Sequence, residues 1–588
     1  MSIQNIKNKV LEQVEKAVKK SFGQKPKDLR LDYPPEVKLG DFTIECFLLA
    51  EQFHQNPAQI AKTLADHIAC GDIIKEVKAV GAYLNFKISN QALFSEACAQ
   101  IISQDQIFGS SSIGQNQRVM IEYLSPNTNK PLHLGHLRNG ALGMALANLY
   151  QTAGYTVIKA NLVNDRGVHI CKSMLAWQKW AQGATPESTQ TKGDHFVGRW
   201  YVRYSKEAET NPELENDVQK MLKKWETGDK EIIKLWKMMN NWVYPGFTQT
   251  YKAFGLEFDV FYYESDTYKL GKAIVAQGIK KKIFYKDDKG AAVFDLPEEE
   301  FGRDKDGNIK KALILRADGT SVYMTQDIGT ALLKTEEHQL DRSIYVVGCE
   351  QEHHFKCLFK ILQALGYSWA GGLHHLSYGM VYLPEGKMKS REGKVVDADD
   401  LIDEMTKLAA EEIRKRDPEN KLSGDQIQKR AAKIGVGAIK FYLLRVGPHQ
   451  DIHFDPKASV SFDGVTGPYC QYAYARTAGI LRNAHEAGID ADGVDFGLLG
   501  NNEELALIQK LMQFPDKALA AAEQFNPSQA AGHIYETAQA FNQFYHQHSV
   551  LAAESKELIK ARLALVKSAA IVLKKGLNLL GIEALEEM

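Results

Sequence analysis

The feature that most constrains the fold of this chain is residues 119–149, where a strand pattern passes through a tight turn into a helix pattern. Residues 119–124 are rich in β-forming side chains and end at a Ser-Pro-Asn break. Apolar side chains then recur at helical spacing from Leu142 to Leu149. His133-Leu134-Gly135-His136 stands where this helix begins. A strand, a turn and a helix in this order predict the first half of a βαβ unit, which builds a parallel sheet.

The two histidines of this turn predict a nucleotide site. Side chains three residues apart near a helix start share one face, and the helix N-terminus attracts anions. Gly135 allows a flat ligand to lie against the backbone. His133 and His136 would then meet the phosphates. A chance pair and a metal site are the alternatives, although the glutamate of a His-Glu-x-x-His zinc motif is missing.

The same alternation of strand and helix continues downstream. Further strand patterns follow at 155–162, 311–316 and 343–348. We therefore predict a parallel-sheet α/β domain over residues 115–450, with a polar, helix-rich insertion at 183–300. Ligands bind such sheets at the carboxyl ends of the strands, where His133 and His136 fall.

A second and a third domain are predicted on either side of the sheet. Residues 1–110 combine helical stripes with a strand pattern at 77–86, which indicates a small α+β domain. A Gly/Ser-rich break at 109–114 separates it from the sheet. Residues 460–588 carry helical patterns, which indicates an all-α domain.

Some polar residues allow a functional and a plainer interpretation. Tyrosine and arginine on the first helix of the last domain can stack on unpaired RNA bases, but core packing is the alternative for any one tyrosine. Asp327 follows a strand pattern at 321–325 and is expected to cap a helix. His353 and His354 are expected to be exposed to solvent rather than to bind a metal.

Composition limits the class of protein and its compartment. The chain has 588 residues, enough for about three or four domains, and no apolar run approaches the ~20 residues of a membrane span. Its N-terminus does not resemble a signal or transit peptide. The seven cysteines are scattered without a Cys-x-x-Cys pair, which favours free thiols in a reducing cytoplasm. The net charge of −1 means that any nucleic-acid surface must be a local patch. The absence of coiled-coil heptads favours a monomer.

Two motifs together resemble a known enzyme class. His133-Leu134-Gly135-His136 is similar to the HIGH signature of class I aminoacyl-tRNA synthetases, and Lys387-Met388-Lys389-Ser390-Arg391 is similar to a degenerate KMSKS loop. Within that class the chain resembles the arginyl-tRNA synthetase family over essentially its whole length. The further marks are Ser125-Pro126-Asn127, Asp318-Gly319-Thr320-Ser321-Val322-Tyr323, Gly379-Met380-Val381 and Gly467-Pro468-Tyr469.

The resemblance implies a fold, a reaction and partners. The fold would be the class I Rossmann-like domain, with an additional N-terminal domain that contacts tRNA and an all-α anticodon-binding domain. The carboxylate of L-arginine, ionised at neutral pH, would attack the α-phosphate of ATP. The arginyl group would then pass to the 3′ end of tRNA(Arg), in protein synthesis. Mg²⁺ is expected with ATP, and a tightly bound metal is not.

The resemblance also assigns residues to these steps. The residues implied in catalysis are His133, His136, Lys130 and Lys387. The residues implied to bind ATP are His133, Gly135, His136, Met380, Val381, Lys387 and Ser390. The residues implied to bind arginine are Glu122, Asn127, Tyr323, Asp327 and Gln351, and those implied to contact tRNA are Tyr469, Tyr472 and Arg476. A guanidinium is best met by a carboxylate in bidentate contact, which suits Asp327.

The chain departs from the family pattern at two places. Ser390 stands where the loop signature carries its second lysine. In this family a lysine before the first histidine is thought to substitute, which implies Lys130, while Lys389 is a competing candidate. Asn164-Asp165-Arg166-Gly167 replaces the commoner Gly-Asp-Trp-Gly, which leaves the role of this turn open.

Three other functions remain as alternatives. One is a class I synthetase for another amino acid, against which Tyr323, Asp327 and Gln351 argue. Another is a small-molecule nucleotidyltransferase, although such enzymes are shorter and lack a C-terminal helical domain. The last is a catalytically inactive, RNA-binding paralogue, which the intact histidines and Lys387 disfavour.

Overall fold

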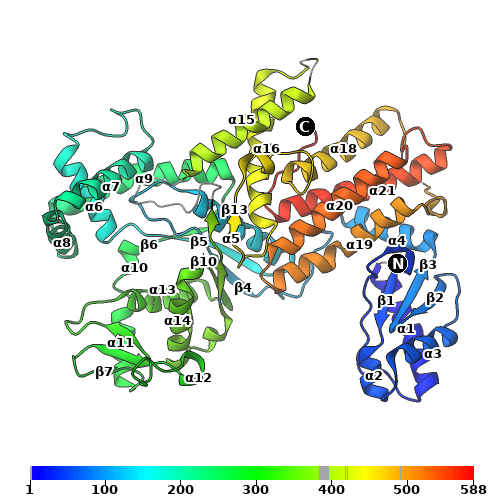
Figure 1. Cartoon of the computed structure of the whole chain (residues 1–588), viewed down its shortest axis with the longest axis horizontal. Coiled ribbons are helices and arrows are strands. Elements are labelled where there is room, and N and C mark those ends of the chain that lie inside the picture. Colours follow the sequence, from blue (N-terminus) through cyan, green and yellow to red (C-terminus); the bar gives the residue numbers. More distant parts are fainter. Residues whose placement is uncertain (1–2, 383–395, 418, 420, 491–492) are drawn as a thin grey trace.

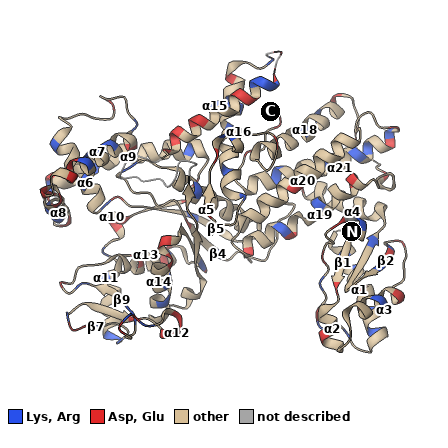
Figure 2. Ribbon diagram, viewed as in Figure 1, with Lys and Arg blue, Asp and Glu red and all other residues tan. Residues whose placement is uncertain are grey.

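The structure is a computed structural model that describes the chain apart from residues 1–2, 383–395, 418, 420 and 491–492. Lys387, Lys389 and Ser390 therefore lie outside the described residues. Figure 1 shows a central sheet, two lobes that extend from it, and C-terminal helices that stand between the sheet and the N-terminal domain. Basic and acidic residues are mixed along the same elements, as on α8 and α15 in Figure 2. In the described part of the chain, no helix combines the length and the apolarity that a membrane crossing requires.

Five parallel strands form the central sheet and confirm the predicted α/β fold. They lie in the order β11-β10-β4-β5-β6, and each neighbouring pair is parallel. Their bounds are Arg118–Glu122 (β4), Thr156–Val163 (β5), Val260–Tyr263 (β6), Arg342–Gly348 (β10) and Leu373–Tyr378 (β11). Helix α5, Leu134–Thr152, connects β4 to β5 and is buried along most of its length. The helix that follows the His-x-Gly-His turn is therefore part of the core.

Two predictions about this sheet are wrong. The pattern at 311–316 does form a strand, β9 (Lys311–Leu315), but it belongs to a separate antiparallel sheet of order β7-β8-β9. The segment 183–300 is not one helical insertion, because β6 within it is an edge strand of the central sheet. Alternation of side chains indicates a strand but not its sheet, and a strand of four residues is too short for alternation to be recognised.

The elements before and after β6 form two lobes, visible at the left of Figure 1. The helices of the first lobe are α6 (Val168–Trp180), α7 (Gly193–Thr210), α8 (Glu213–Glu226) and α9 (Lys230–Phe254). The second lobe contains α10 (Glu264–Thr267), α11 (Gly271–Lys280), β7 (Tyr285–Lys286), β8 (Ala292–Asp295), α12 (Glu298–Phe301), β9, α13 (Tyr323–His338) and α14 (Glu352–Ala364). The second lobe has its own apolar core, around Phe284, Ile328 and Leu358.

The N-terminal domain has the predicted α+β character. Its antiparallel sheet has the order β1-β3-β2. Its elements are α1 (Ile3–Phe22), β1 (Phe42–Glu45), α2 (Phe47–Phe53), α3 (Pro57–His67), β2 (Ile74–Val80), β3 (Tyr83–Ile88) and α4 (Asn90–Gln104). Gly40 has a φ of 140°, and a Cβ there would lie 2.7 Å from the Phe86 carbonyl oxygen. The buried Asp41 accepts hydrogen bonds from Ile88 and from Gln509 of the C-terminal domain, so this motif joins two domains.

The C-terminal part is helical, as predicted. Its helices are α15 (Ala398–Arg416), α16 (Gly424–Leu444), α17 (Pro456–Ser459), α18 (Gly467–Glu486), α19 (Asn502–Glu523), α20 (Pro527–Gln547) and α21 (Lys556–Leu579). A short parallel pair, β12 (Val381–Tyr382) and β13 (Ile452–His453), ties this part to the sheet domain. The final residues fold back, because Lys440 donates to the Gly581 carbonyl (2.6 Å) and Gln471 donates to the Glu583 carbonyl (2.9 Å).

Candidate active site

The His-x-Gly-His turn is the N-terminal cap of α5. The His133 Nδ1 atom accepts a hydrogen bond from the Gly135 N–H, and the His136 Nδ1 atom accepts one from the His133 N–H, both at 3.1 Å. The two ring centroids are 3.9 Å apart. A Cβ on Gly135 would lie only 3.0 Å from the His133 ring, so any larger residue here would crowd the ring. The local hydrogen bonds thus hold both imidazoles side by side at the helix start.

Both imidazoles are neutral hydrogen-bond donors. Burial, and then the charge of Lys130, lowers the pKa of His133 to about 3. Burial, and then the charges of His133 and Lys130, lowers the pKa of His136 as well. Because Nδ1 accepts a hydrogen bond in each ring, the hydrogen-bond pattern assigns the proton to Nε2. Each ring therefore offers one Nε2–H to an anion without carrying a charge of its own.

A cavity of about 470 Å³ opens beside this turn, at the carboxyl ends of the strands. Its volume is that of a typical site for a small molecule or cofactor. It brings together seven residues that the sequence predicted, namely Lys130, His133, Gly135, His136, Gln351, Met380 and Val381. The end of β10 and Tyr378 complete its wall. The predicted ATP residues that the structure describes therefore line one cavity.

Two buried polar residues that sequence reasoning missed brace this cavity. The Asn139 side chain accepts from the Leu124 N–H (2.5 Å) and donates to the Val346 carbonyl (2.8 Å), so it joins the ends of β4 and β10. Arg138 has no exposed surface and donates to the carbonyls of Met380, Pro448 and Gln450. The sequence did contain a signal for both residues. Polar side chains near the start of a helix made of small and apolar residues will be buried and therefore need polar partners.

A second group of residues, which we call the acidic pocket, consists of Tyr323 and the carboxylates of Glu122, Glu264 and Asp327. Desolvation, followed by the negative charges of Asp327, Glu264 and Glu122, raises the pKa of the Tyr323 hydroxyl. Tyr323 nevertheless remains 57% exposed. Carboxylates from β4, α10 and α13 therefore lie near enough to one accessible phenol to raise its pKa, and such acceptors suit a cation with several N–H donors.

Glu264 is the member of the acidic pocket that sequence reasoning missed. Burial raises its pKa to about 7; the charge of Arg166 opposes this rise, and the charges of Asp165 and Asp327 add to it. No motif surrounds Glu264 in the sequence, and only the fold brings α10 beside α13. The expected helix cap at Asp327 is also wrong, because α13 already begins at Tyr323. Asp327 lies one turn further along and faces the pocket instead.

The other two carboxylates of the acidic pocket, Glu122 and Asp327, are paired with basic side chains. Glu122 forms a buried ion pair with Lys334 of α13, and Asp327 lies 2.5 Å from His354 Nε2. His354 is thus partly buried rather than simply exposed as predicted, whereas His353 is exposed. His354, which contacts Asp327 of the acidic pocket, follows the cavity residue Gln351 by only three positions. The acidic pocket therefore adjoins the cavity.

Glu122, Asn127, Tyr323 and Asp327 do not line the cavity itself. Asn127 is exposed, and the backbone beside it is joined to Asn164 by two hydrogen bonds. These bonds run from the Thr128 N–H to the Asn164 carbonyl (3.1 Å) and from the Asn164 N–H to the Pro126 carbonyl (2.9 Å). The structure therefore places Gln351 in the cavity wall, Glu122, Tyr323 and Asp327 in the acidic pocket, and Asn127 on an exposed stretch bonded to the turn at Asn164.

The described residues before 383–395 line the cavity, and those after this segment bond to the His-x-Gly-His turn. Val381 lines it before this segment. After the segment, the Val396 carbonyl accepts from the Leu134 N–H (3.1 Å), and the Ala398 N–H donates to the Leu132 carbonyl (3.0 Å). The predicted loop residues Lys387 and Ser390 lie outside the described residues.

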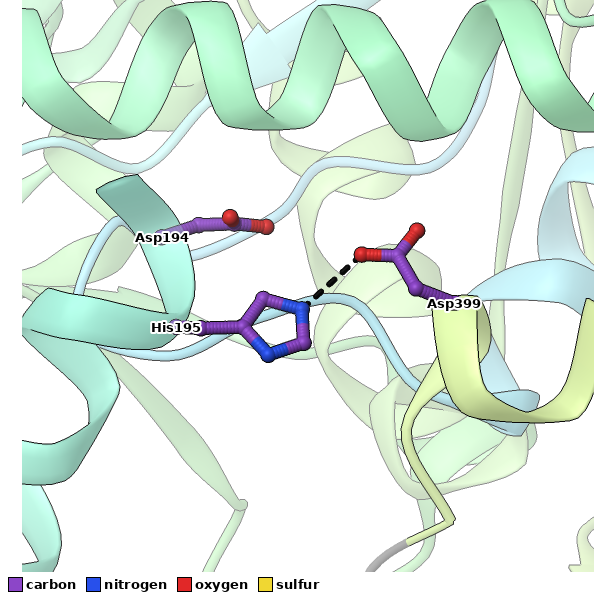
Figure 3. Close-up of side chains that lie close together, drawn as sticks. All are labelled: Asp194, His195 and Asp399. Carbon is purple, nitrogen blue, oxygen red and sulfur yellow. Dashed lines mark hydrogen bonds and ion pairs between the residues drawn. The ribbon is translucent and has the colours of Figure 1, made fainter. Parts of the chain in front are cut away.

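Asp194, His195 and Asp399 lie together beside the turn, in an arrangement that could hold a metal ion (Figure 3). The Lys192 ammonium lies 2.6 Å from Asp399 Oδ2 and 3.2 Å from Asp194 Oδ2, and His195 Nε2 lies 2.8 Å from Asp399 Oδ2. Although burial opposes it, hydrogen bonds from His195 and Lys192 lower the pKa of Asp399. A protein cation thus already neutralises these carboxylates, and the cluster attaches α15 to α7.

The predicted tRNA residues lie on α18, half-buried. The Arg476 guanidinium lies 4.7 Å from the ring centroid of Tyr472 and 4.6 Å from that of Tyr545. It also donates to Asn542 of α20 (2.9 Å). The Tyr469 ring packs against Tyr535 at 5.4 Å. The structure brings these residues into an aromatic and basic stripe on the helical domain, whereas Tyr474 is buried.

Comparisons with known proteins agree over the whole chain. Family models match residues 97–455 (tRNA synthetases class I (R), catalytic domain), 470–588 (DALR anticodon binding domain) and 4–88 (Arginyl tRNA synthetase N terminal domain). The arginine–tRNA ligase of Treponema denticola is 42% identical over 572 residues, which is 96% of this chain and 95% of that protein. The arginine–tRNA ligase of Bacteroides thetaiotaomicron is 41% identical over an alignment of 604 residues, gaps included, that covers 99% of this chain and 100% of that protein. The solved structure of Thermus thermophilus arginyl-tRNA synthetase superposes with a TM-score of 0.82 at 27% identity, covering 99% of this chain and 100% of that one.

Proposed function

The chain belongs to the arginyl-tRNA synthetase family of class I, and we propose that the cavity and the acidic pocket divide that family's reaction between them. The activity is the ATP-dependent activation of L-arginine and the transfer of the arginyl group to the 3′ end of tRNA(Arg). The observation that carries the division of roles is the convergence of three carboxylates on Tyr323 beside a cavity capped by two neutral histidines. One part suits a guanidinium, and the other suits a nucleotide.

The cavity would orient ATP and stabilise charge on its phosphates. The ionised carboxylate of arginine attacks the α-phosphate directly, so the step needs no general base. His133 and His136 would donate from Nε2 to phosphate oxygens, and Lys130 would add a positive charge at the same end of the cavity. Met380 and Val381 would contact the adenine. Lys387 and Ser390 keep their proposed contacts with the phosphates, and Mg²⁺ would enter with ATP.

The acidic pocket would hold arginine. Asp327, Tyr323 and Glu264 would accept hydrogen bonds from the guanidinium, while Glu122, Asn127 and Gln351 would hold the α-amino and carboxylate groups. Lysine carries a point charge without a planar fork and would leave several of these acceptors unpaired. A site of this kind can discriminate by about 10⁴ or more, so a separate editing domain is unnecessary.

Two surfaces would contact tRNA. The stripe of Tyr469, Tyr472 and Arg476 in the anticodon-binding domain offers stacking rings and a stacked guanidinium. In the N-terminal domain, Phe47 and Tyr83 are 46% and 40% exposed and pack edge to face at 6.0 Å. Exposed aromatic pairs are suited to unstacked bases. We assign residues 1–110, 115–450 and 460–588 to tRNA contact, catalysis and anticodon binding, respectively.

We also propose that the enzyme acts as a monomer in the cytoplasm. The seven cysteines are free, as suits a reducing compartment.

Arginine-dependent ATP–pyrophosphate exchange tests the function. We expect exchange with arginine in the presence of tRNA(Arg), little without tRNA, and none with lysine in either case. Absence of exchange under both conditions would contradict the enzyme activity. Exchange with lysine but not with arginine would contradict the specificity.

Replacing Lys130 with alanine tests which lysine compensates for Ser390. Loss of one positive charge directed at the reacting phosphates is expected to lower the rate of adenylate formation by about 10²–10³, with a smaller rise in the KM for arginine. Single-turnover kinetics measure the rate. Lys389→Ala is the matched variant: normal turnover in Lys130→Ala together with a slow Lys389→Ala would transfer the role to Lys389.

A further inference from the structure

The turn at 164–167 between β5 and α6 has no role in the proposed binding of ATP and arginine. Three of its residues nevertheless form hydrogen bonds or ion pairs with other segments near the pocket. Its first residue is joined to the chain before the His-x-Gly-His turn, because Asn164 Nδ2 donates to the Ser125 carbonyl (2.9 Å). Asp165 and Arg166, the next two residues, both reach the start of α10, where Glu264 stands. The turn therefore contacts both ends of the arginine site.

Asp165 fixes the backbone beside Glu264. It is 1% exposed, and its carboxylate accepts from the Ser265 N–H (2.9 Å), the Ser265 hydroxyl (2.8 Å) and the Tyr244 hydroxyl (3.0 Å). The Trp236 indole donates to its carbonyl oxygen (2.6 Å). A carboxylate with three donors and a bonded backbone holds the first turn of α10 in one position.

Arg166 contacts Glu264 itself. Its side chain is 8% exposed, and Nη1 lies 3.9 Å from Glu264 Oε1. With the Gln326 amide oriented to match its neighbours, its oxygen accepts from Arg166 Nη1 and its nitrogen donates to Glu264 Oε1, both at 3.1 Å. Gln326 precedes Asp327 on α13. Among the described residues these contacts fall on Oε1, which leaves Oε2 for a ligand.

The Arg166 guanidinium is confined on its other sides. It stacks on Tyr268 at 4.1 Å and on Trp225 at 5.2 Å from the ring centroids. Its Nη2 pairs with Glu226 at 3.0 Å. This ion pair offsets a positive charge that would otherwise repel an arginine substrate.

We propose that Arg166 is a positioning residue of the guanidinium pocket: it holds Glu264 and Gln326 in place, so that Glu264 meets the substrate guanidinium as a carboxylate. This inference rests on the proposed assignment of the acidic pocket to arginine. It gives a role to Arg166, one of the two residues at which the turn departs from the Gly-Asp-Trp-Gly of the family; the other is Asn164. A tryptophan cannot supply the charge, so this chain uses an arginine of its own beside the one that it binds.

The charges around Glu264 predict a pH dependence. Burial raises its pKa to about 7, Arg166 opposes the rise, and Asp165 and Asp327 add to it, with Tyr323 alongside. Below this pKa Glu264 is protonated and binds a guanidinium poorly, so the KM for arginine should fall as pH rises through about 7. Removing the positive charge of Arg166 should move this midpoint to higher pH.

The experiment compares the wild type, Arg166→Met, Arg166→Lys and Glu264→Gln in tRNA-dependent pyrophosphate exchange between about pH 6 and 9. For Arg166→Met we expect a KM for arginine raised about fivefold at neutral pH if the midpoint moves by one unit, and about tenfold more for each further unit, with the KM for ATP nearly unchanged. Arg166→Lys keeps the positive charge, so the midpoint of its pH profile should lie close to the wild-type value. Glu264→Gln should remove the pH dependence.

Arg203→Met is the matched control. Like Arg166, Arg203 lies over two aromatic rings, at 4.9 Å from Trp180 and 5.8 Å from Trp200 in the first lobe, and it pairs with Glu207 of its own helix. Its loss should leave the arginine profile unchanged.

The outcomes separate the inference from the proposed function. A wild type without arginine-dependent exchange would contradict the function. An active wild type whose profile survives Arg166→Met unchanged would overturn the role of Arg166, as would equal changes in the KM values for arginine and ATP. If Arg166→Met does not fold, Arg166→Lys and Glu264→Gln still decide: a wild-type profile that Glu264→Gln leaves in place would also overturn the inference.

Discussion

Asp327→Asn is expected to lower kcat/KM for arginine by about 10²–10³, because removing one partner of a desolvated charge pair costs about 2–5 kcal/mol. The asparagine keeps the shape of the side chain but replaces one acceptor with a donor that would face the guanidinium N–H groups. The KM for ATP should change little, since Asp327 does not line the cavity. Steady-state pyrophosphate exchange with varied arginine and varied ATP measures both constants.

The neighbours of Asp327 supply the controls for this variant. His354, 2.5 Å away, orients the carboxylate, so His354→Ala should raise the KM for arginine by a smaller factor. Asp318→Asn removes an acid of the same lobe that bonds only within its own turn, to Thr320, and should behave as the wild type. An Asp327→Asn enzyme with an unchanged KM for arginine would remove Asp327 from the pocket.

Local sequence pattern was sufficient for the parts of the fold that depend on neighbouring residues. The strand, turn and helix around His133 were predictable because β alternation, a Ser-Pro break and helical spacing follow one another within one segment. β6 was not, since four residues that form an edge strand carry no usable period. β9 was recognised as a strand but placed in the wrong sheet, because pairing partners lie far away in the chain.

The site residues also fall into those that the sequence could predict and those that it could not. The cavity residues belong to short motifs that the family resemblance could mark. Glu264 and Lys334 carry no motif, and Arg166 stands in a turn whose role the sequence left open. Each acts on a partner contributed by another element: α10 on α13, a β5–α6 turn on α10, and α13 on β4. Interactions between distant segments are set by tertiary packing, so a single sequence leaves them open. In the proposed site, arginine specificity would depend on these three residues as well as on the motifs.

Lys334→Met is the second large effect that we expect, and it tests whether one helix spans the arginine. Lys334 is 2% exposed and pairs with Glu122, with the rings of Tyr262 and Tyr345 at 5.3 and 5.8 Å from its ammonium. It lies seven residues after Asp327, which is two helical turns and about 10 Å along the same face of α13. In the proposed site, the helix therefore carries Asp327 as the guanidinium acceptor and, two turns on, Lys334, which pairs with the Glu122 carboxylate proposed for the α-amino group.

Breaking a buried ion pair by removing one partner costs about 3–5 kcal/mol, because the remaining charge is left without compensation. Lys334→Met should therefore lower the melting temperature and raise the KM for arginine far more than the KM for ATP. The double variant Glu122→Gln/Lys334→Met distinguishes the two causes. It removes the uncompensated charge, so it should recover much of the thermal stability, but it lacks the carboxylate for the α-amino group and should keep the weak arginine binding. Recovery of both properties in the double variant would make the pair purely structural and would take Glu122 out of the arginine site, while recovery of stability alone would place the substrate along α13 between Asp327 and Lys334.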